Sequence, residues 1–317
     1  MAVILRDVAA ACGCDVSTVS RALREDPRVA RATRTRVQAA ARRLGYRPNL
    51  LARQLQAGRT GAIWLVLSGI DSQQSWEPAE AASRTCSAAG YDLHVLVHHE
   101  DPAAHQRIHE RVRQGLCDAL LVVACGVDLA DPAPLCELAA AGFPLAFLDR
   151  HLEGIAAPTF TTANAEAAFE LVRRCAAAGA QAVLVAFGQG NTVERTRMQG
   201  VRAAARSCGL PLLTEASATQ PVGTTVAVIG LNDGQLQRLV RSEGAPWQAC
   251  RFLYGLFDGY QNEPLAAEYI TVCTQDFTTM ASAAADYLLA RCAGAAPQDG
   301  VTLVPVRAFT TLTPTGS

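Results

Sequence analysis

The sequence predicts an α/β protein in which a helix-turn-helix headpiece precedes a two-lobed body built on doubly wound parallel sheets. Two observations point to the headpiece. Residues 1–60 contain twelve arginines against four acidic residues, and Gly13 joins two short helical patterns within them. One observation points to the body: from Gly61 onward, short runs of Val and Leu alternate with Ala-rich stretches of helical period, the order that builds parallel sheets covered on both faces.

Charge and hydropathy limit the possible functions. The 317-residue chain has a net charge of −1, but residues 1–60 account for +8 and the rest for −9. The basic end is therefore the expected contact for a polyanion such as DNA. No run approaches the roughly 20 apolar residues of a membrane span, and Arg6 and Asp7 leave no room for a signal-peptide core. We expect a cytoplasmic protein without membrane contact, whose eleven cysteines form no structural disulfide.

The headpiece helices follow from the spacing of apolar residues. A first helix over residues 6–11 ends at Gly13, and Asp15 is a suitable N-cap for a second one over residues 16–23. In the second helix Val19 faces inward, while Ser17, Thr18 and Arg21 face outward. Two short helices joined by a tight glycine turn are typical of a helix-turn-helix motif.

A third and a fourth helix complete this segment. The third, over residues 32–44, has an apolar inward face and ends at Gly45. After it, Asn49 can cap a short helix that Gly58 closes. A helix of about eight residues is marginal in isolation, so it would need its twin in a dimer or a DNA groove to persist.

Five short motifs in this segment have a specific order and spacing: Asp7-Val8-Ala9, Thr18-Val19-Ser20-Arg21, Thr33-Arg34, Leu44 to Asn49 and Gly58 to Gly61. They resemble the DNA-binding headpiece of the lactose and galactose repressor family (LacI/GalR). The resemblance implies three kinds of DNA contact. Base edges are read by Val16, Ser17 and Arg21; phosphates are held by Thr18, Ser20, Thr33 and Asn49; Leu55 wedges into the minor groove at the centre of a palindrome. The expected DNA-binding set also includes Arg24, Tyr46 and Arg53.

Two positions depart from the family pattern. Arg24 stands where Asn is usual after the recognition helix, and Ala30 stands where a Ser or Thr cap is usual, so the operator sequence is not carried over. The alternative interpretation is a basic bundle that binds a protein partner, with Leu55 as a packing residue. For Arg42 and Arg43 two interpretations stay open: they contact phosphates, or they lie on a solvated helix face.

The body alternates strands and helices. Expected strands are residues 62–67, 91–97, 119–124, 145–148, 182–187, 226–230, 252–254 and 270–273; expected helices are 77–89, 103–114, 163–177, 195–208, 233–243 and 277–291. Ligands of such sheets bind at the carboxyl ends of the strands. The polar residues that follow those ends are 71–75, Asp149 and Arg150, 189–197, Asn232 and Asp233, Asp258, and Gln275 with Asp276.

These strand-end residues again resemble the family, whose effector domain is like a periplasmic sugar-binding protein with three crossovers between its lobes. Arg197 in the segment 195–200 matches the family's effector-binding arginine. Asn232-Asp233 resembles its Ala-Asn-Asp motif, and Asp258 belongs to an imperfect Gly-Phe-Asp-Asp motif in which Phe257 replaces an acid. The resemblance implies an effector site of Ser75, Asp149, Arg150, Arg195, Arg197, Asn232, Asp258 and Gln275.

A narrower resemblance is to the fructose repressor and catabolite repressor-activator branch, through residues 143–150, 191–200 and Gln275-Asp276. In that branch the ligand is a phosphorylated fructose. Arg150, Arg195 and Arg197 would suit a phosphate, because guanidinium groups bind it bidentately. An interlobe salt bridge is the alternative for Arg150, and a structural role is the alternative for Arg197.

The expected domains are a helix-turn-helix domain at 1–48, a hinge helix and linker at 49–60, and an effector-binding and dimerisation domain at 61–317. The N-terminal lobe of the last would comprise about 61–160 and 276–298, and its C-terminal lobe about 161–275 and 299–317. Between Leu213 and Val226 the chain is shorter than the family usually is, as if one helix of the C-terminal lobe were missing.

Histidines and cysteines raise the question of a metal or redox site. His105 and His109 are four residues apart, with three more histidines at positions 94, 98 and 99, so a metal site is conceivable. A solvated helix face is the favoured interpretation. Cys12 and Cys14 lie in the recognition turn, where Cys14 replaces the family's common Val, and a sensor role is not favoured.

Signatures of catalysis are weak. The segment 188–190 lacks the third glycine of a dinucleotide site, and the sequence contains no Walker loop or nucleophile elbow. We expect no metal, no cofactor and no enzymatic activity.

The combined expectation is a homodimeric transcription regulator, acting as a repressor of carbohydrate-metabolism genes, that binds a palindromic operator in double-stranded DNA. A sugar or sugar phosphate in the cleft would shift the lobes and thereby the folding of the paired hinge helices. The chain stops at Ser317 without a leucine-heptad tail, which favours a dimer over a tetramer. Two alternatives stay open: a ligand-independent dimeric DNA binder, and a sugar-phosphate enzyme fused to a DNA-binding head. Whether ligand relieves or strengthens DNA binding also stays open.

Overall fold

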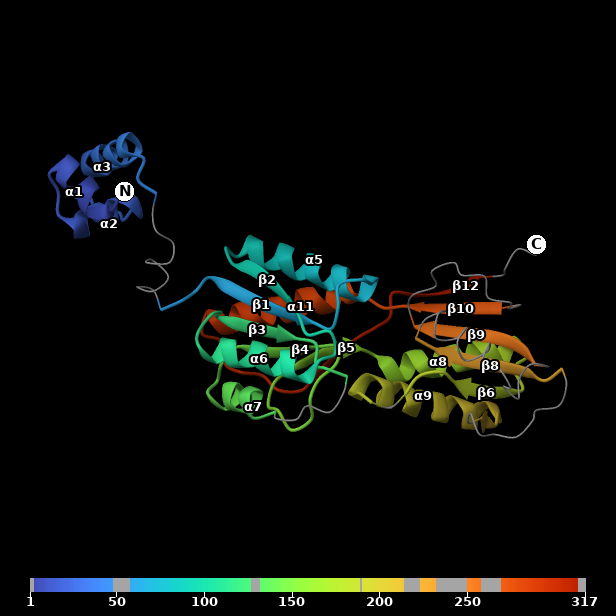
Figure 1. The fold of residues 1–317 in the computed structure, drawn as a ribbon. Coiled ribbons are helices and arrows are strands. Elements are labelled where there is room, and N and C mark those ends of the chain that lie inside the picture. Colours follow the sequence, from blue (N-terminus) through green and yellow to red (C-terminus); the bar gives the residue numbers. More distant parts are fainter. Residues whose placement is uncertain are drawn as a thin grey trace. The chain divides into compact units, whose positions relative to one another are not determined.

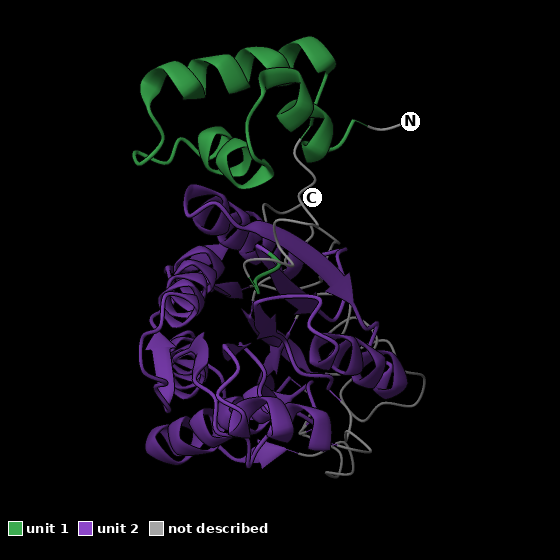
Figure 2. Cartoon of the chain, turned by 90° about the vertical axis from the view of Figure 1, so that its left-hand side faces the viewer, with its two compact units in different colours: residues 1–60 green, residues 61–317 purple. Residues whose placement is uncertain are grey.

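The computed structural model of the chain describes residues 3–47, 58–126, 132–188, 190–213, 223–231, 250–257 and 269–312. The chain divides into two compact units, residues 1–60 and 61–317 (Figure 2). In the ranges just given, no helix is long and apolar enough to cross a bilayer.

The described part of the first unit is a bundle of three helices: α1 (Leu5–Cys12), α2 (Val16–Leu23) and α3 (Arg31–Leu44). These bounds confirm the predicted helices to within one residue. Gly13 and Gly45 follow α1 and α3 with φ of 62° and 65°, the left-handed conformation that glycine adopts without strain. The core of the bundle is built around Val8, Val19 and Val37, all completely buried.

The first sheet of the second unit is parallel throughout, in the order β11-β5-β4-β3-β1-β2. Its strands are β1 (Ala62–Leu67), β2 (Asp92–Val97), β3 (Ala119–Val122), β4 (Leu145–Leu148), β5 (Thr159–Thr162) and β11 (Val301–Val304). Helices α5 (Gln73–Ala88) and α11 (Phe277–Cys292) cover one face, and α6 (Pro102–Arg113) and α7 (Ala133–Ala140) cover the other (Figure 1). Because both faces are covered, β1 is buried along its whole length.

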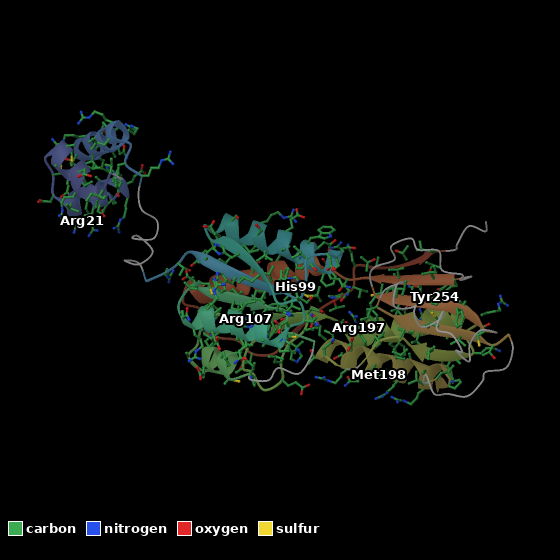
Figure 3. All side chains as sticks on the ribbon, in the orientation of Figure 1. Arg21, His99, Arg107, Arg197, Met198 and Tyr254 are labelled. Carbon is green, nitrogen blue, oxygen red and sulfur yellow. The ribbon has the colours of Figure 1, made fainter. Side chains whose placement is uncertain are left out.

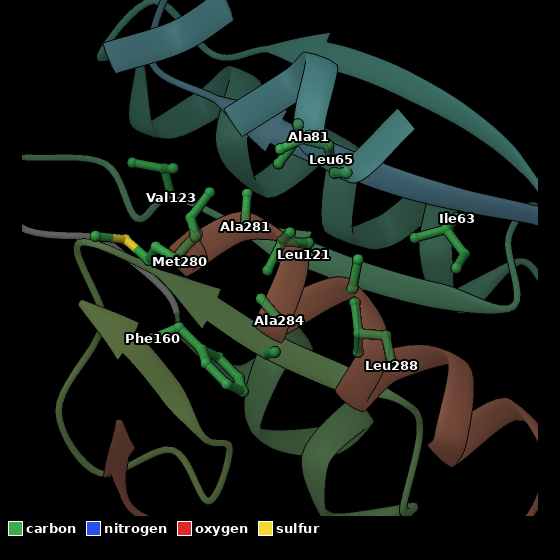
Figure 4. Close-up of a cluster of buried hydrophobic side chains, with 14 of the residues drawn as sticks. Ile63, Leu65, Ala81, Leu121, Val123, Phe160, Met280, Ala281, Ala284 and Leu288 are labelled. Carbon is green, nitrogen blue, oxygen red and sulfur yellow. The ribbon is translucent and has the colours of Figure 1, made fainter. Parts of the chain in front are cut away.

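The core under α5 and α11 is the larger of the two clusters on this sheet. Met280 and Leu288 of α11 share it with Leu65 and Leu121 of the sheet and with Ala81 of α5 (Figure 4). Helix α11 begins after Asp276, whose side chain accepts a hydrogen bond from the Thr279 amide at 3.0 Å, and its first turn lies at the carboxyl ends of the strands.

The second sheet has the order β12-β10-β9-β8-β6-β7 and is parallel except for the edge strand β12, which pairs antiparallel with β10. Its strands are β6 (Ala182–Val185), β7 (Leu212–Leu213), β8 (Thr225–Gly230), β9 (Arg251–Phe257), β10 (Tyr269–Thr274) and β12 (Ala308–Leu312). Helices α8 (Asn164–Ala177) and α9 (Thr192–Cys208) pack on one face through a buried apolar cluster. Gly200 of α9 lies so close to α8 that a Cβ there would overlap the carbonyl oxygen of Ala165.

The predicted strands of the body are confirmed, but four further strands and one helix were not predicted. The missed elements are β5, β7, β11, β12 and α7. In β5 the sequence Thr-Phe-Thr-Thr has no apolar run, and β11 and β12 are edge strands whose residues are mostly exposed. The helix expected at 233–243 lies outside the described residues, as does most of the shortened segment between Leu213 and Val226.

The chain crosses between the two sheets three times: between β5 and α8, between β10 and α11, and between β11 and β12. Three crossovers were expected, but the last was expected at 298–299. Since β11 pairs with β5 in the first sheet, that sheet extends to Val304 and the crossing lies between Val304 and Ala308. The first lobe therefore includes residues that had been assigned to the second.

Candidate nucleic-acid interface and ligand cleft

Helix α2 of the first unit has an outward face of the predicted composition. Val16 is 41% exposed, although it is apolar, and Ser17 is exposed beside it. Arg21 is exposed on the same helix (Figure 3). Val19 and Ala22, on the opposite face, are completely buried. A basic helix with an exposed apolar residue and hydroxyls can read base edges in a major groove, where valine meets thymine methyl groups and arginine meets guanine.

The expected phosphate contacts lie at the edges of this face. Thr18 and Thr33 line one surface depression together with Arg6 and Arg36, two guanidinium groups that the sequence analysis did not include. Arg36 Nη2 also donates a hydrogen bond to Cys14 Sγ at 3.4 Å. The outward position of these arginines on their helices was the signal that could have identified them.

The other predicted DNA contacts that the structure describes do not line this depression. Arg24 Nη2 donates to Ser20 Oγ at 2.9 Å, so these two side chains form a single polar group at the end of α2. Tyr46 is half-buried against the headpiece core. The predicted contacts at Asn49, Arg53 and Leu55 lie outside the described residues.

A cleft of about 560 Å³ lies in the second unit at the carboxyl ends of the first sheet. The first turns of α5, α9 and α11 also contribute to its walls. Of the eight expected effector residues, five line it: Ser75, Asp149, Arg150, Arg197 and Gln275. Arg195 does not line it, because its guanidinium pairs with Glu153 at 2.8 Å on the exposed side of α9. Asn232 and Asp258 lie outside the described residues.

Arg197 is the most deeply placed cation of the cleft (Figure 3), with only 4% of its surface exposed. Its Nε donates to Asn164 Oδ1 at 2.7 Å and its Nη2 to Gln275 Oε1 at 3.2 Å. The guanidinium carbon lies 3.8 Å from the ring centroid of Phe257, a cation–π contact. These contacts fix the orientation of the guanidinium, as the alternative of a structural role for Arg197 predicts.

The hydrogen bonds of Arg197 continue across two crossovers. Thr162 Oγ1 donates to Gln275 Oε1 at 2.7 Å, and Asn164 Nδ2 donates to Thr161 Oγ1 at 3.1 Å. Thr161 Oγ1 in turn donates to Asp149 Oδ1 at 3.4 Å. The network therefore joins the end of β5, the start of α8, the middle of α9 and the start of α11.

Asp149 and Arg150 follow β4. Asp149 adopts a φ of 60°, a strained conformation for a residue with a side chain, and such strain is concentrated at functional sites. Arg150 Nη2 pairs with Glu100 Oε1 at 2.7 Å within the first lobe, not across the lobes as the alternative had it. Burial acts to raise the pKa of Glu100, but the hydrogen bond and charge of Arg150 outweigh it and lower the pKa below its ordinary value. Gly126 leaves room for the pair, since a Cβ there would lie 2.7 Å from Arg150 Nη1.

The expected effector set omitted several residues that line the cleft. Asn191 and Glu194 belong to the strand-end segment 189–197 but were not included in that set, and Asn191 caps α9 by accepting a hydrogen bond from the Glu194 amide at 2.9 Å. Glu100 was missed altogether. Glu100 follows the carboxyl end of β2, so the same strand-end rule applied to β2 would have found it. Counting Asp71 and Asp149, four carboxylates and two guanidiniums face the described part of the cleft. Alternating acceptors and donors of this kind are suited to a ligand with many hydroxyl groups.

The histidine interpretation is wrong. His98, His105 and His109 are completely buried rather than solvated. The i, i+4 pair stands on the inward face of α6 with Ile108 and Val112, so the spacing reflects the core face of the helix. Burial lowers the pKa of His105 to about 3 and that of His109 to about 2.

Comparison with known families agrees with this architecture. Residues 4–49 match the sequence model of bacterial regulatory proteins of the lacI family. Residues 60–225 match the model of periplasmic binding proteins and the sugar binding domain of the LacI family.

Among curated proteins, the chain is 32% identical to the HTH-type transcriptional regulator RafR of Escherichia coli over 69% of this chain and 66% of RafR. It is 29% identical to the regulator PtxS of Pseudomonas plecoglossicida over 92% of this chain and 90% of PtxS. Among solved structures, the Lac repressor dimer bound to operator and the anti-inducer ONPF superposes with a TM-score of 0.73 at 20% identity, covering 96% of this chain and 97% of that one. The Cra dual regulator of Pseudomonas putida in complex with fructose 1-phosphate superposes with a TM-score of 0.65 at 18% identity, covering 81% and 100%.

Proposed function

Because the chain belongs to the LacI family of DNA-binding transcription regulators, we propose that it is a homodimeric, cytoplasmic repressor whose operator affinity is set by a sugar or sugar phosphate in the cleft. The proposed domains are the headpiece at 1–48, the hinge at 49–60 and the effector body from residue 61. Its relatives RafR and PtxS are transcriptional regulators, which leaves the alternative of a fused enzyme without support.

The observation that carries the proposal is the position of Arg197. The side chain faces the cleft and is hydrogen-bonded to Asn164 and Gln275, which begin α8 and precede α11 at two crossovers. A ligand that contacts this guanidinium would favour one arrangement of the crossovers over another. A change in lobe arrangement would then alter how the paired hinge segments meet the DNA.

The charges of the cleft narrow the class of effector. Four carboxylates accept hydrogen bonds from sugar hydroxyls but repel phosphates, and one of the two guanidiniums, Arg150, is already paired with Glu100. One anionic group can bind to Arg197 and to the first turn of α5, where Ser72 and Ser75 lie. The proposed effector is therefore a neutral sugar or a monophosphate such as fructose 1-phosphate, and not a bisphosphate.

The test is fluorescence anisotropy with a palindromic operator carrying a central CG step, repeated with fructose, fructose 1-phosphate and fructose 1,6-bisphosphate. A coupling free energy of 1–3 kcal/mol would change operator affinity by roughly 5- to 150-fold. A shift with fructose 1-phosphate that exceeds the shift with the bisphosphate supports the assignment of the cleft. Tight DNA binding that no member of a broad sugar panel alters would favour the ligand-independent DNA binder instead.

A further inference from the structure

Glu100 places a negative charge of the protein itself at one end of the cleft. The residue follows β2 and Arg150 follows β4, and two strands, β1 and β3, lie between β2 and β4 in the sheet. Glu100 Oε1 accepts a hydrogen bond from Arg150 Nη2 at 2.7 Å, so the pair extends across the carboxyl edge where ligands of such sheets bind. Both side chains line the cleft. A carboxylate therefore lies where the anionic group of a ligand would otherwise reach Arg150.

The second oxygen of this carboxylate is held as well. Glu100 Oε2 accepts a hydrogen bond from the backbone amide of Gly126, and the thiol of Cys125 donates to it at 3.6 Å. Gly126 leaves the space open, since a Cβ there would lie 3.0 Å from Glu100 Oε2. Burial acts to raise the pKa of Glu100, but the hydrogen bond and charge of Arg150 lower it below its ordinary value. The carboxylate is therefore ionised at neutral pH and fixed in one orientation.

The backbone before this carboxylate adopts an unusual conformation. His99 and Glu100 have φ of 52° and 57°, in the left-handed region that residues with side chains rarely adopt. The completely buried ring of His98 holds this turn: Nδ1 accepts from the Glu100 amide at 3.1 Å, and Nε2 donates to the Val123 carbonyl oxygen at 3.1 Å. Strained backbone that is stabilised in this way beside a cleft indicates that the position of Glu100 serves ligand binding.

Charge, and not space, limits what this end of the cleft can accept. The volume of about 560 Å³ lies within the range of roughly 300–1,000 Å³ that is usual for small-molecule pockets, so a hexose with two phosphates is not too large. The two guanidiniums differ in their partners. Arg197 donates to the neutral side chains of Asn164 and Gln275, whereas Arg150 donates to a carboxylate. The charge of Arg150 is therefore neutralised within the protein.

We propose that Glu100 is a specificity-determining residue of the cleft, whose carboxylate occupies Arg150 and so excludes a second anionic group of the ligand. This role of Glu100 rests on the proposed function and deepens it, because it assigns the two ends of the cleft. A phosphate of the ligand binds at Arg197 and the first turn of α5. Uncharged hydroxyl groups meet the Glu100–Arg150 pair, where carboxylate oxygens accept hydrogen bonds and guanidinium nitrogens donate them.

The experiment compares E100Q with the parent protein, both full-length, by calorimetric titration with fructose 1-phosphate, fructose 1,6-bisphosphate and inorganic phosphate. Glutamine has the shape of glutamate, and its amide oxygen can still accept from Gly126, but the charge is lost. The bisphosphate should bind E100Q at least about tenfold more tightly than it binds the parent, because charge-assisted hydrogen bonds to Arg150 become available. Fructose 1-phosphate should change by less than about threefold, since its phosphate binds at the other end and distant sites behave independently.

Two further variants separate the ion pair from a general change in charge. E153Q removes the carboxylate of another such pair, Glu153–Arg195 at 2.8 Å, which does not line the cleft, and it should leave all three affinities unchanged. The double variant E100Q/R150A should lose the gain in bisphosphate affinity, because Arg150 is the group that E100Q frees. Circular dichroism establishes that each variant is folded before its affinities are compared.

Inorganic phosphate tests the role of Glu100 apart from the proposed function, because it can bind a freed guanidinium whether or not the cleft takes a sugar. A phosphate site that E100Q has, and that the parent and E100Q/R150A lack, supports this role even if no sugar binds, in which case only the effector proposal fails. Equal affinities of E100Q and the parent for bisphosphate and for phosphate would overturn the assignment of Glu100, while binding of fructose 1-phosphate would leave the effector proposal standing. A gain that persists in E100Q/R150A, or that E153Q reproduces, would overturn it too.

Discussion

Thr162 Oγ1 donates a hydrogen bond to Gln275 Oε1 at 2.7 Å and thereby links two of the three segments that cross between the sheets. Thr162 ends β5 in the first sheet, and Gln275 follows β10 of the second. The same Gln275 oxygen accepts a hydrogen bond from Arg197 at 3.2 Å. Both linked residues are buried, so a rearrangement of the lobes that separates these two crossovers would have to break these bonds.

Substitution of Gln275 should uncouple the cleft from the headpiece. In Q275A, operator affinity without ligand should stay close to that of the parent protein, while the ligand-induced change in affinity should shrink by roughly tenfold, because a residue of a coupling network carries about 0.5–2 kcal/mol. Anisotropy titrations with and without effector measure both quantities. Q114A, on the exposed end of α6, is the control and should behave like the parent. Equal ligand responses in Q275A and Q114A would contradict the prediction.

Arg197 and Arg195 provide a matched pair on one helix. R197A should weaken effector binding by about two orders of magnitude, and R197K should also lose affinity because lysine cannot reproduce the bidentate geometry. R195A should change it by less than about twofold, since an exposed ion pair such as Arg195–Glu153 contributes little. Calorimetric titration of folded variants gives the affinities. Comparable losses in R195A and R197A would argue against the assignment of the cleft.

The exposed face of α2 predicts that two arginines of the headpiece, Arg21 and Arg28, differ in their contribution to operator affinity. R21A should lower affinity for the operator by roughly 5- to 150-fold, because a bidentate contact to a base is worth about 1–3 kcal/mol. Its affinity for unrelated DNA should change much less. Arg28 is exposed and pairs with Asp26 at 2.7 Å, and the hydrogen bonds from Arg28 lower the pKa of that carboxyl to about 2. R28A is therefore the control. The prediction fails if both variants lose specific binding equally.

Acid should destabilise the body through His109. Burial, reinforced by His105 and His98, lowers its pKa to about 2 in the folded protein, whereas an unfolded histidine titrates near 6.5. Below pH 6.5 the unfolded chain binds a proton that the folded protein does not, so the free energy of unfolding falls by about 1.4 kcal/mol per pH unit, or about 2 kcal/mol at pH 5. Above pH 6.5 both states are neutral at this position and the contribution is flat.

The variant H109L should remove this share of the pH dependence and leave stability at pH 7.5 equal or higher, because it removes two buried nitrogens that have no hydrogen-bond partner among the residues the structure describes. Urea denaturation at pH 7.5 and pH 5, with EDTA present, measures it. H94A, at an exposed position on β2, should keep the slope of the parent. A slope in H109L that matches the slope in H94A would show that His109 stays accessible to protons.

Gly200 should be intolerant of any side chain. G200A would drive its Cβ into the carbonyl oxygen of Ala165, and overpacking of this kind costs about 1–3 kcal/mol. Thermal unfolding should show a lower midpoint than that of R202A, a truncation on the exposed side of the same helix. An unchanged midpoint would mean that α8 and α9 can separate at no cost.

Much of this protein could be predicted from local patterns in the sequence. The headpiece helices followed from apolar spacing and from Gly13 and Gly45, and the strands of the body followed from short apolar runs. Five cleft residues, among them Asp149 and Arg197, followed from the rule that parallel strands present their carboxyl ends at one edge. These features depend on interactions between residues that are close in the sequence, so they can be predicted from local sequence patterns.

Other features depended on which surfaces came together in the folded chain. Arg195 and Arg197 have the same chemistry, but two residues along a helix turn the side chain by about 200°, and only packing against α8 decided which one faces the cleft. The spacing of His105 and His109 is compatible with either a solvated or a buried helix face. Both side chains are buried because α6 packs this face against the sheet. The pairing of β11 with β5 joins residues 142 positions apart, and the pairing of Glu100 with Arg150 joins residues 50 positions apart. Local periodicity does not encode contacts over such separations.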